Sequence, residues 1–306
     1  MEIAIQTGSL VDDWGAKEAY RMLAEAGYRS VDWSLGRGWD RKKIKAGILA
    51  PTFFAESVDA IEAHYREEME EMRKNGIWPN QIHTPFPAYV PNFPELEDYV
   101  HGIYVNCIRF CERIGVKYAV VHGISLAMDD YTQTPETIRE LNHRLYERLI
   151  PVLQETNVVV CLENLFTEYN GMKISGTCCD PVEACAYIDR FNEMAGKECF
   201  GFCLDSGHLN LLGIRPDVFI RAMGSRIKVL HLHDNNGVDD EHMAPYTGKI
   251  IWKDLIGALK EVGYSGELGF ETSKQVEKTR LDKAVVPVYL KTIYEIGKVF
   301  SDMIEA

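Results

Sequence analysis

The sequence predicts a protein of the α/β class that folds as a single (β/α)8 TIM barrel. Along all 306 residues, short apolar runs of strand length alternate with longer amphipathic stretches, and eight of each can be recognised. No linker, low-complexity segment or change of composition interrupts this alternation. Alternating strands and helices favour parallel strands joined by right-handed crossovers, and eight such strands close most economically into a barrel. We therefore expect residues 1–306 to form one domain.

The eight strand-like runs are short and apolar, and turn-forming or polar residues follow them. They are Glu2–Thr7, Ser30–Leu35, Gln81–Phe86, Tyr118–Gly123, Val158–Asn164, Phe200–Asp205, Ile227–Asp234 and Glu267–Thr272. The first run continues into Thr7-Gly8-Ser9-Leu10, which lacks the glycine-rich phosphate turn typical of an open, doubly wound sheet. The closed barrel is therefore favoured over that alternative.

The stretches between the strand-like runs have helical periodicity, and several of them carry capping residues. They are Trp14–Ala26, Glu56–Asn75, Leu96–Ile114, Thr134–Glu155, Val182–Phe191, Pro216–Met223, Trp252–Val262 and Leu281–Phe300. Gly27, Gly76 and Gly115 each follow a predicted helix, as expected of a C-terminal cap. A proline inside the last stretch, Pro287, is expected to break or kink its start.

Composition and charge limit the cellular location and the kinds of binding partner that we expect for this protein. The chain carries 46 acidic and 33 basic residues, a formal net charge of −13, which disfavours nucleic-acid phosphates as partners. The short basic run Arg41-Lys42-Lys43 is interpreted as a solvated turn. No stretch is apolar enough to span a membrane, and Met1–Leu10 does not resemble a signal peptide. None of the eight cysteines forms a C-x-x-C pair, so we expect a cytoplasmic protein, with homo-oligomers left open.

The third to eighth strand-like runs each end in a metal-binding or ionisable side chain. These side chains are His83, His122, Glu163, Asp205 with His208 after it, His231 with His233, and Glu271. Because the C-terminal ends of barrel strands meet at one mouth, we expect them to face a common site. Glu163, Asp205, His231 and Glu271 form a ligand set suited to one divalent metal ion, Mn²⁺, Zn²⁺, Mg²⁺ or Co²⁺. Such a cation would also relieve the repulsion among the carboxylates.

Two pairs of residues near the seventh strand-like run, each containing histidine, leave choices open. His231 and His233 lie two residues apart on a strand and so point to the same face. We prefer His231 as the metal ligand and expect His233 to bind substrate or to orient a ligand. Asp240 and His242 form a D-x-H pair in the following loop, for which an exposed acidic loop is an equally good interpretation.

Five aromatic residues are candidates for packing on a sugar ring or for a lid. They are Trp14, Trp33, Phe53, Phe54 and Phe86. Ordinary packing in the core or on the surface is the favoured interpretation of each one taken singly.

These motifs together resemble the xylose-isomerase-like TIM barrel superfamily over essentially the whole chain. The motifs are "LEN" around Glu163, "LDSGH" from Leu204 to His208, "HLHDN" from His231 to Asn235, the D-x-H pair, and "GFET" around Glu271. The superfamily contains sugar phosphate isomerases and epimerases, ketose 3-epimerases, inosose-processing enzymes and the metal-dependent endonucleases of AP endonuclease family 2. The resemblance implies that the four ligands above hold one metal ion and that Glu163 and Glu271 act as acid and base.

The expected function is therefore a metal-dependent isomerase or epimerase acting on a small sugar, sugar phosphate or inosose-like polyol. One glutamate would remove the proton beside a carbonyl to give an enediolate, and the other glutamate would return it. Return to the neighbouring carbon gives isomerisation, whereas return to the opposite face gives epimerisation, and the sequence leaves this choice open. The residues expected to bind substrate are His208, His233, His83, His122, His242 and Asp240.

Other functions could use the same residues. In the endonucleases, the resemblance implies a trinuclear zinc cluster that adds the matches to His83, His122, His208, Asp240 and His242. Gly123 stands where those enzymes have a proline, and His233 stands where they usually have an asparagine. The net charge also disfavours DNA. An inosose-type dehydratase would share the site, and a non-catalytic sugar-binding barrel would use the metal positions only as structure.

Overall fold

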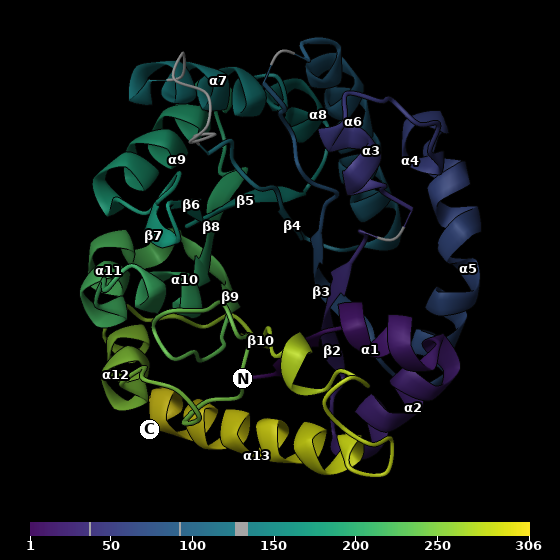
Figure 1. Ribbon diagram of the computed structural model, residues 1–306, viewed down its shortest axis with the longest axis vertical. Coiled ribbons are helices and arrows are strands. Elements are labelled where there is room, and N and C mark those ends of the chain that lie inside the picture. The colour runs from purple at the N-terminus through teal and green to yellow at the C-terminus, as the bar shows by residue number, and fades with distance from the viewer. Residues whose placement is uncertain (37, 92, 126–133) are drawn as a thin grey trace. The chain divides into compact units, whose positions relative to one another are not determined.

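A computed structural model of the chain describes residues 1–36, 38–91, 93–125 and 134–306 (Figure 1). The main sheet contains eight strands: β1 (Ile3–Gln6), β2 (Ser30–Ser34), β3 (Trp78–His83), β4 (Tyr118–Val120), β5 (Val159–Glu163), β8 (Phe200–Asp205), β9 (Ile227–His231) and β10 (Leu268–Phe270). Two further strands, β6 (Phe166–Tyr169) and β7 (Met172–Ser175), form a separate antiparallel hairpin.

Helices follow the strands of the main sheet. They are α1 (Gly8–Trp14), α2 (Ala16–Ala26), α3 (Arg41–Lys45), α4 (Phe53–Glu56), α5 (Val58–Lys74), α6 (Glu95–Ile114), α7 (Pro135–Glu147), α8 (Ile150–Gln154), α9 (Pro181–Ala195), α10 (Ser206–Leu211), α11 (Pro216–Met223), α12 (Trp252–Glu261) and α13 (Val286–Glu305). Two short 3₁₀ turns, η1 (Gly224–Arg226) and η2 (Ser273–Gln275), complete the described elements.

The strands of the main sheet are parallel and follow the order β10-β1-β2-β3-β4-β5-β8-β9. The two strands at the ends of this order are also joined, because Leu232, directly after β9, bridges Phe270 of β10 in parallel. The Leu232 N–H donates to the Gly269 carbonyl, and the Glu271 N–H donates to the Leu232 carbonyl. Eight parallel strands in a closed order are the sheet of a (β/α)8 TIM barrel. The predicted fold class is therefore confirmed.

The chain forms two compact units, each made of segments distant in sequence. Unit 1 contains residues 1–34, 66–81 and 203–306, and unit 2 contains residues 35–65 and 82–202. Of the four boundaries between them, two fall inside the strands β3 and β8, one falls inside α5, and one directly follows β2. The expectation of a single domain stays a prediction.

Unit 1 is organised around β1, which pairs with β10 on one side and with β2 on the other. Helices α2, α12 and α13 pack next to one another in this unit, with α13 lying against β1 and β10 (Figure 1). This close approach depends on Gly297 of α13, since a Cβ there would lie 2.8 Å from Ile3 and from Phe270. A buried carboxylate, Glu68 of α5, accepts hydrogen bonds from Tyr20 Oη at 2.7 Å and Trp33 Nε1 at 2.8 Å. It thereby ties α5 to α2 and β2.

Unit 2 is built on the parallel pair β4 and β5, in which Ala119 lies opposite Val160. Asn142 of α7 is fully buried, and its side chain holds the segment after β4 in place. Its Oδ1 accepts from the Ile124 N–H at 2.8 Å, and its Nδ2 donates to the Ile124 carbonyl at 2.8 Å. The segment that follows His122 is therefore fixed by a side chain of a distant helix.

The predicted elements differ from the observed ones mainly at their ends. The third strand was predicted at Gln81–Phe86 but lies three residues earlier, at Trp78–His83. The predicted helix Trp14–Ala26 corresponds to α2, which begins after Gly15 (φ 76°, ψ 156°), whereas α1 before it was not predicted. The predicted helix Thr134–Glu155 is two helices, with Pro151 in the first turn of α8. The last helix, predicted at Leu281–Phe300 with its start broken or kinked by Pro287, is α13, which begins only at Val286 and carries the proline in its first turn.

Candidate metal and active site

The end of β8 places the first carboxylate of the candidate site in unit 1. Asp205 is fully buried and forms the N-terminal cap of α10, where its Oδ1 accepts from the His208 N–H at 2.7 Å. The same carboxylate contacts His233 Nε2 at 3.0 and 3.1 Å, while His208 Nδ1 lies 3.7 Å from its Oδ2. These contacts join the "LDSGH" and "HLHDN" motifs into one cluster.

The glycine of the "LDSGH" motif is required by close packing. A Cβ on Gly207 would lie 1.9 Å from His233 Cε1, well inside van der Waals contact. Ser206 beside it anchors the same histidine, because its hydroxyl donates to the His233 carbonyl at 2.9 Å and accepts from the His233 N–H at 3.0 Å. The motif therefore fixes both the backbone and the ring of His233.

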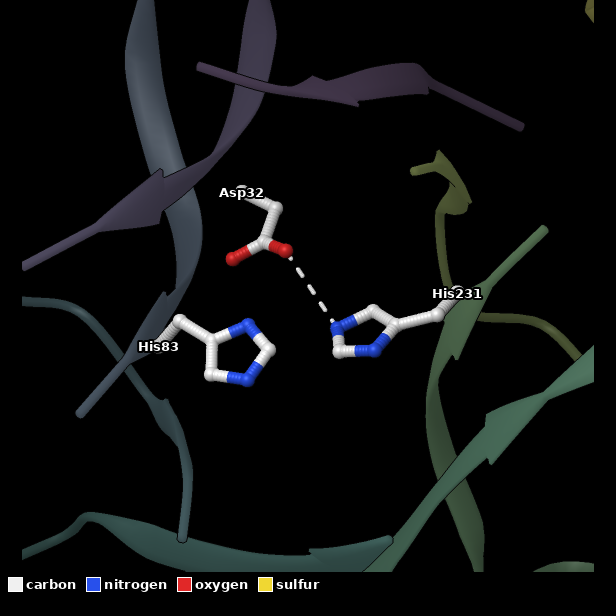
Figure 2. A group of neighbouring side chains, drawn as sticks. All are labelled: Asp32, His83 and His231. Carbon is white, nitrogen blue, oxygen red and sulfur yellow. Dashed lines mark ion pairs between the residues drawn. The ribbon is translucent and has the colours of Figure 1, made fainter. Parts of the chain in front are cut away.

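The end of β10 places the second carboxylate of unit 1, Glu271. Its Oε2 lies 3.2 Å from His231 Nδ1, and its Oε1 accepts from Gln6 Nε2 at 2.6 Å. The other nitrogen of His231, Nε2, lies 3.3 Å from Oδ2 of Asp32 (Figure 2). Asp32 and His231 are each about 1% exposed, so this ion-pair contact is deeply buried.

The D-x-H pair belongs to this cluster and is not an exposed acidic loop. His242 Nε2 lies 2.7 Å from Oδ2 of Asp240, its ring stacks on His233 at 4.2 Å between centroids, and its Nδ1 lies 3.7 Å from Oε1 of Glu271. Against the opposing effect of burial, the charge of Glu271 and the hydrogen bond with Asp240 raise the pKa of His242 to about 9. Burial alone would raise the pKa of Asp240, but the hydrogen bond with His242 holds it well below its usual range.

Unit 2 contains three of the predicted site residues in one group. His122 Nε2 lies 3.0 Å from Oε2 of Glu163, which is about 1% exposed at the end of β5. His83 Nε2 lies 2.7 Å from His122 Nε2 and 3.8 Å from the same glutamate oxygen. The ring of Phe86 lies 4.2 Å from that of His122 between centroids. The ligand-type atoms of His83, His122 and Glu163 are close enough together to share a cation.

The predicted residues thus form two groups. Unit 1 holds Asp205, His208, His231, His233, Asp240, His242 and Glu271, and unit 2 holds His83, His122 and Glu163. The convergence of Glu163 with Asp205, His231 and Glu271 on one metal ion stays a prediction, as do the roles of the single residues. Oxygen and imidazole donors without thiolate fit a divalent cation such as Mn²⁺, Co²⁺ or Zn²⁺.

Two residues of the cluster in unit 1 were missed in the sequence, Gln6 and Asp32. Gln6 is the last residue of β1, where polar residues of a barrel gather, and that position was the available signal. Asp32 lies in the middle of β2, where no such signal marks it. Of the five aromatic candidates, Trp33 and Phe54 are buried in the core, and Phe86 is the one in ring contact with a predicted site residue.

Comparison with known proteins agrees with the closed sheet and its strand-end motifs. A family model described as "Xylose isomerase-like TIM barrel" matches residues 20–286. The chain belongs to this family. The resemblance expected from the motifs is therefore confirmed at the level of the family.

Two relatives of this family member are similar over most of their length. An uncharacterized protein of Sinorhizobium fredii is 35% identical over 270 residues, covering 85% of this chain and 82% of the relative. An uncharacterized protein of Methanocaldococcus jannaschii is 26% identical over 221 residues, covering 70% and 71%.

Solved structures share the fold of this family member at low sequence identity. A D-tagatose 3-epimerase-like protein superposes with a TM-score of 0.67 at 19% identity, covering 100% of this chain and 98% of that one. The IOLI protein with a binding zinc atom gives a TM-score of 0.65 at 14% identity, covering 99% and 98%. At these identities the likeness is evidence for the fold alone.

Proposed function

We propose that this family member is a divalent-metal-dependent isomerase or epimerase that acts on a small sugar, sugar phosphate or inosose-like polyol. The observation that carries the proposal is a set of three buried carboxylates at strand ends, each within 3.2 Å of an imidazole nitrogen. Glu163 contacts His122, Asp205 contacts His233, and Glu271 contacts His231. Solved structures of the same fold include epimerases of free ketoses and a zinc-binding protein, which is compatible with this chemistry.

The proposed metal ligands are Glu163, Asp205, His231 and Glu271. When bound, a divalent cation would supply the positive charge that polarises the carbonyl group of the substrate. His231 is preferred over His233 because its Nδ1 faces Glu271, whereas both oxygens of Asp205 engage His233. His233, held by Asp205 and by Ser206, is suited to orienting that carboxylate.

Glu163 and Glu271 are the proposed acid and base. Both carboxylates are buried, and each lies beside a polar side chain, His122 for Glu163 and Gln6 for Glu271, which holds it in place for proton transfer. One glutamate takes the proton from the carbon beside the carbonyl, and the other returns it. Hydrogen-bond donors such as His208 and His242 are proposed to bind the hydroxyl groups of the substrate.

Exchange of substrate protons with solvent tests this function. The protein is incubated in D₂O with a panel of ketoses, inososes and their phosphates, with Mn²⁺, Zn²⁺, Mg²⁺ or Co²⁺, and deuterium in the recovered sugar is measured by mass spectrometry. We expect Glu271→Gln to lower exchange by about 10²-fold or more, the usual contribution of a general acid or base. Glu193→Gln, on the exposed side of α9, is the matched control and should exchange like the wild type. Equal exchange by the wild type and Glu271→Gln would remove Glu271 from the mechanism.

A second function, hydrolysis of abasic DNA with three zinc ions, is favoured by one observation. Beyond the four proposed ligands, His83 and His122 lie beside Glu163, and His208 and His242 lie beside Asp205 and Glu271, so further cations could be held. The net charge of −13 opposes binding of a phosphate backbone. Metal content distinguishes the two functions: one ion per chain supports the isomerase, and three zinc ions with nicking of abasic duplex DNA would support the endonuclease.

Within the described part of the chain, no helix has the length and apolar character needed to cross a membrane. We propose small molecules as the partners, without nucleic acid, and a cytoplasmic location as expected from the cysteine usage.

A further inference from the structure

An arginine in unit 2 departs from the expectation of a solvated basic turn. Residues 41–45 form the short helix α3, capped by Asp40, whose side chain accepts from the Lys42 and Lys43 N–H groups. Lys42 and Lys43 are exposed as expected. Arg41 differs from them, because its guanidinium carbon lies 3.6 Å from the centroid of the Phe86 ring. The guanidinium is therefore held in a defined place against an aromatic face.

This guanidinium has no carboxylate partner among the described residues. The nearest acid in sequence, Asp40, is engaged by the backbone of α3 and by Lys43 Nζ at 3.4 Å. Partial burial of the guanidinium lowers the pKa of Arg41, and no acidic group offsets this effect. In a chain with a net charge of −13, the hydrogen-bond donors of this guanidinium face no carboxylate among the described residues, and an anionic ligand would satisfy them. The residue as a whole remains exposed, so a small anion can still reach it.

Ring contacts connect this arginine to the proposed acid/base residue of the same unit. Phe86 contacts Arg41 and also packs on His122, at 4.2 Å between ring centroids. His122 Nε2 in turn lies 3.0 Å from the carboxylate of Glu163. The rings of Phe86 and His122 thus stand between this cation and the carboxylate of Glu163.

We infer that Arg41 binds an anionic substituent of the substrate, a phosphate or a carboxylate, at the end remote from the carbon that exchanges its proton. The planar guanidinium suits either group, because it can donate two parallel hydrogen bonds to a pair of oxygens. Phe86 serves as the platform that holds this donor pair in place. The inference rests on the proposed function, since it defines the substrate class of that same site.

The first experiment measures binding of an anion without any reaction. Inorganic phosphate and, separately, glycolate are titrated into the full chain by calorimetry at low ionic strength. We expect one of these two anions to bind the wild type at least tenfold more tightly than Arg41→Met. Lys42→Met removes one positive charge from the same helix without touching Phe86, and it should bind like the wild type. Absence of binding of both anions, or equal losses in the two variants, would overturn the inference.

The second experiment distinguishes phosphate from carboxylate during turnover. Solvent-proton exchange is compared for D-fructose, D-fructose 6-phosphate and D-fructuronate, which differ at the last carbon. We expect Arg41→Met to raise KM for one of the two charged sugars about 10- to 100-fold with little change in kcat, and Arg41→Lys to retain part of the affinity. A preference for D-fructose with no effect of Arg41→Met would overturn the inference while leaving the proposed function intact. If no sugar exchanges but Arg41 still binds the anion in the calorimeter, the proposed function fails and the anion site stands.

Discussion

At the scale of single residues, the candidate site depends on small side chains as much as on ligands. Position 207 requires glycine for a steric reason, because a Cβ there would lie 1.9 Å from the ring of His233. That ring cannot easily move aside, since Asp205 holds its Nε2 and Ser206 holds its backbone. The glycine in the "LDSGH" motif therefore sets how closely α10 approaches His233, two residues after the end of β9.

Replacement of this glycine gives the first prediction at this scale. Gly207→Ala should destabilise the protein by about 1–3 kcal/mol, the usual cost of forcing extra volume into a packed site. Helix propensity alone would predict the opposite sign, a gain of roughly 0.5–1 kcal/mol. Urea unfolding measures the change, and the Nε2 resonance of His233 in long-range ¹H–¹⁵N spectra reports whether its contact with Asp205 is lost.

The matched control is Gly102→Ala on α6, where an added Cβ meets nothing within 4 Å. This variant should be as stable as the wild type or more stable. If the two alanine variants unfold at the same urea concentration, the contact between Gly207 and His233 does not limit this site.

At the scale of the elements, α11 carries a charge cluster that should respond to pH. Asp217 in its first turn is 5% exposed and accepts from Arg215 at 2.8 Å and from Arg221 at 2.7 Å. The hydrogen bonds from these arginines hold the pKa of Asp217 below its ordinary value of 3.8. A lowered pKa in the folded state means that this contribution to stability is present above that ordinary value and is lost as the pH falls through the lowered one.

The second prediction follows from the lowered pKa of Asp217 in the folded state. Asp217→Asn should cost about 1–2 kcal/mol at neutral pH, a modest value because both arginines are exposed to solvent. The difference between wild type and variant should shrink steadily below about pH 4. Urea denaturation across this range measures it. A difference that stays constant down to the acid limit of folding would mean that the lost interaction is not electrostatic.

The elements also separate what the sequence can predict from what it cannot. β8 and α11 lie where predicted, because their hydrophobic runs begin and end at clear turn residues. β3 begins three residues before the predicted run, and Pro79, a residue that disfavours a strand interior, lies inside it. The hairpin of β6 and β7 was missed although Asn170 and Gly171, both at positive φ, are the residues expected of a tight hairpin turn.

The residues of the candidate site also divide into those that the sequence predicts and those that it does not. Residue types at strand ends indicated His122, Glu163 and Asp205, since a local pattern is enough to mark them. The contact of His231 with Asp32 and that of Arg41 with Phe86 join residues far apart in the chain. No local pattern specifies such partners, so they become visible only in the folded chain.

At the scale of the whole molecule, the division into two compact units bears on the cooperativity of unfolding. Of the four boundaries between them, two fall inside β3 and β8 and a third falls inside α5, so separation would interrupt two strands of the main sheet and one helix. Each interruption would expose backbone N–H and C=O groups that are costly to leave without hydrogen bonds. We therefore predict one cooperative transition, as expected of a single domain.

The distribution of tryptophans allows a direct test. Of the five tryptophans, Trp39 alone lies in unit 2, whereas Trp14, Trp33, Trp78 and Trp252 lie in unit 1. Biosynthetic labelling with 5-fluorotryptophan gives each ring its own ¹⁹F resonance, and Trp39→Phe assigns the one from unit 2. We expect the Trp39 signal and the other four to convert to their unfolded positions at the same urea concentration and with the same slope. If Trp39 converts at a distinct midpoint, the chain is two cooperative domains, and the single-domain prediction is wrong.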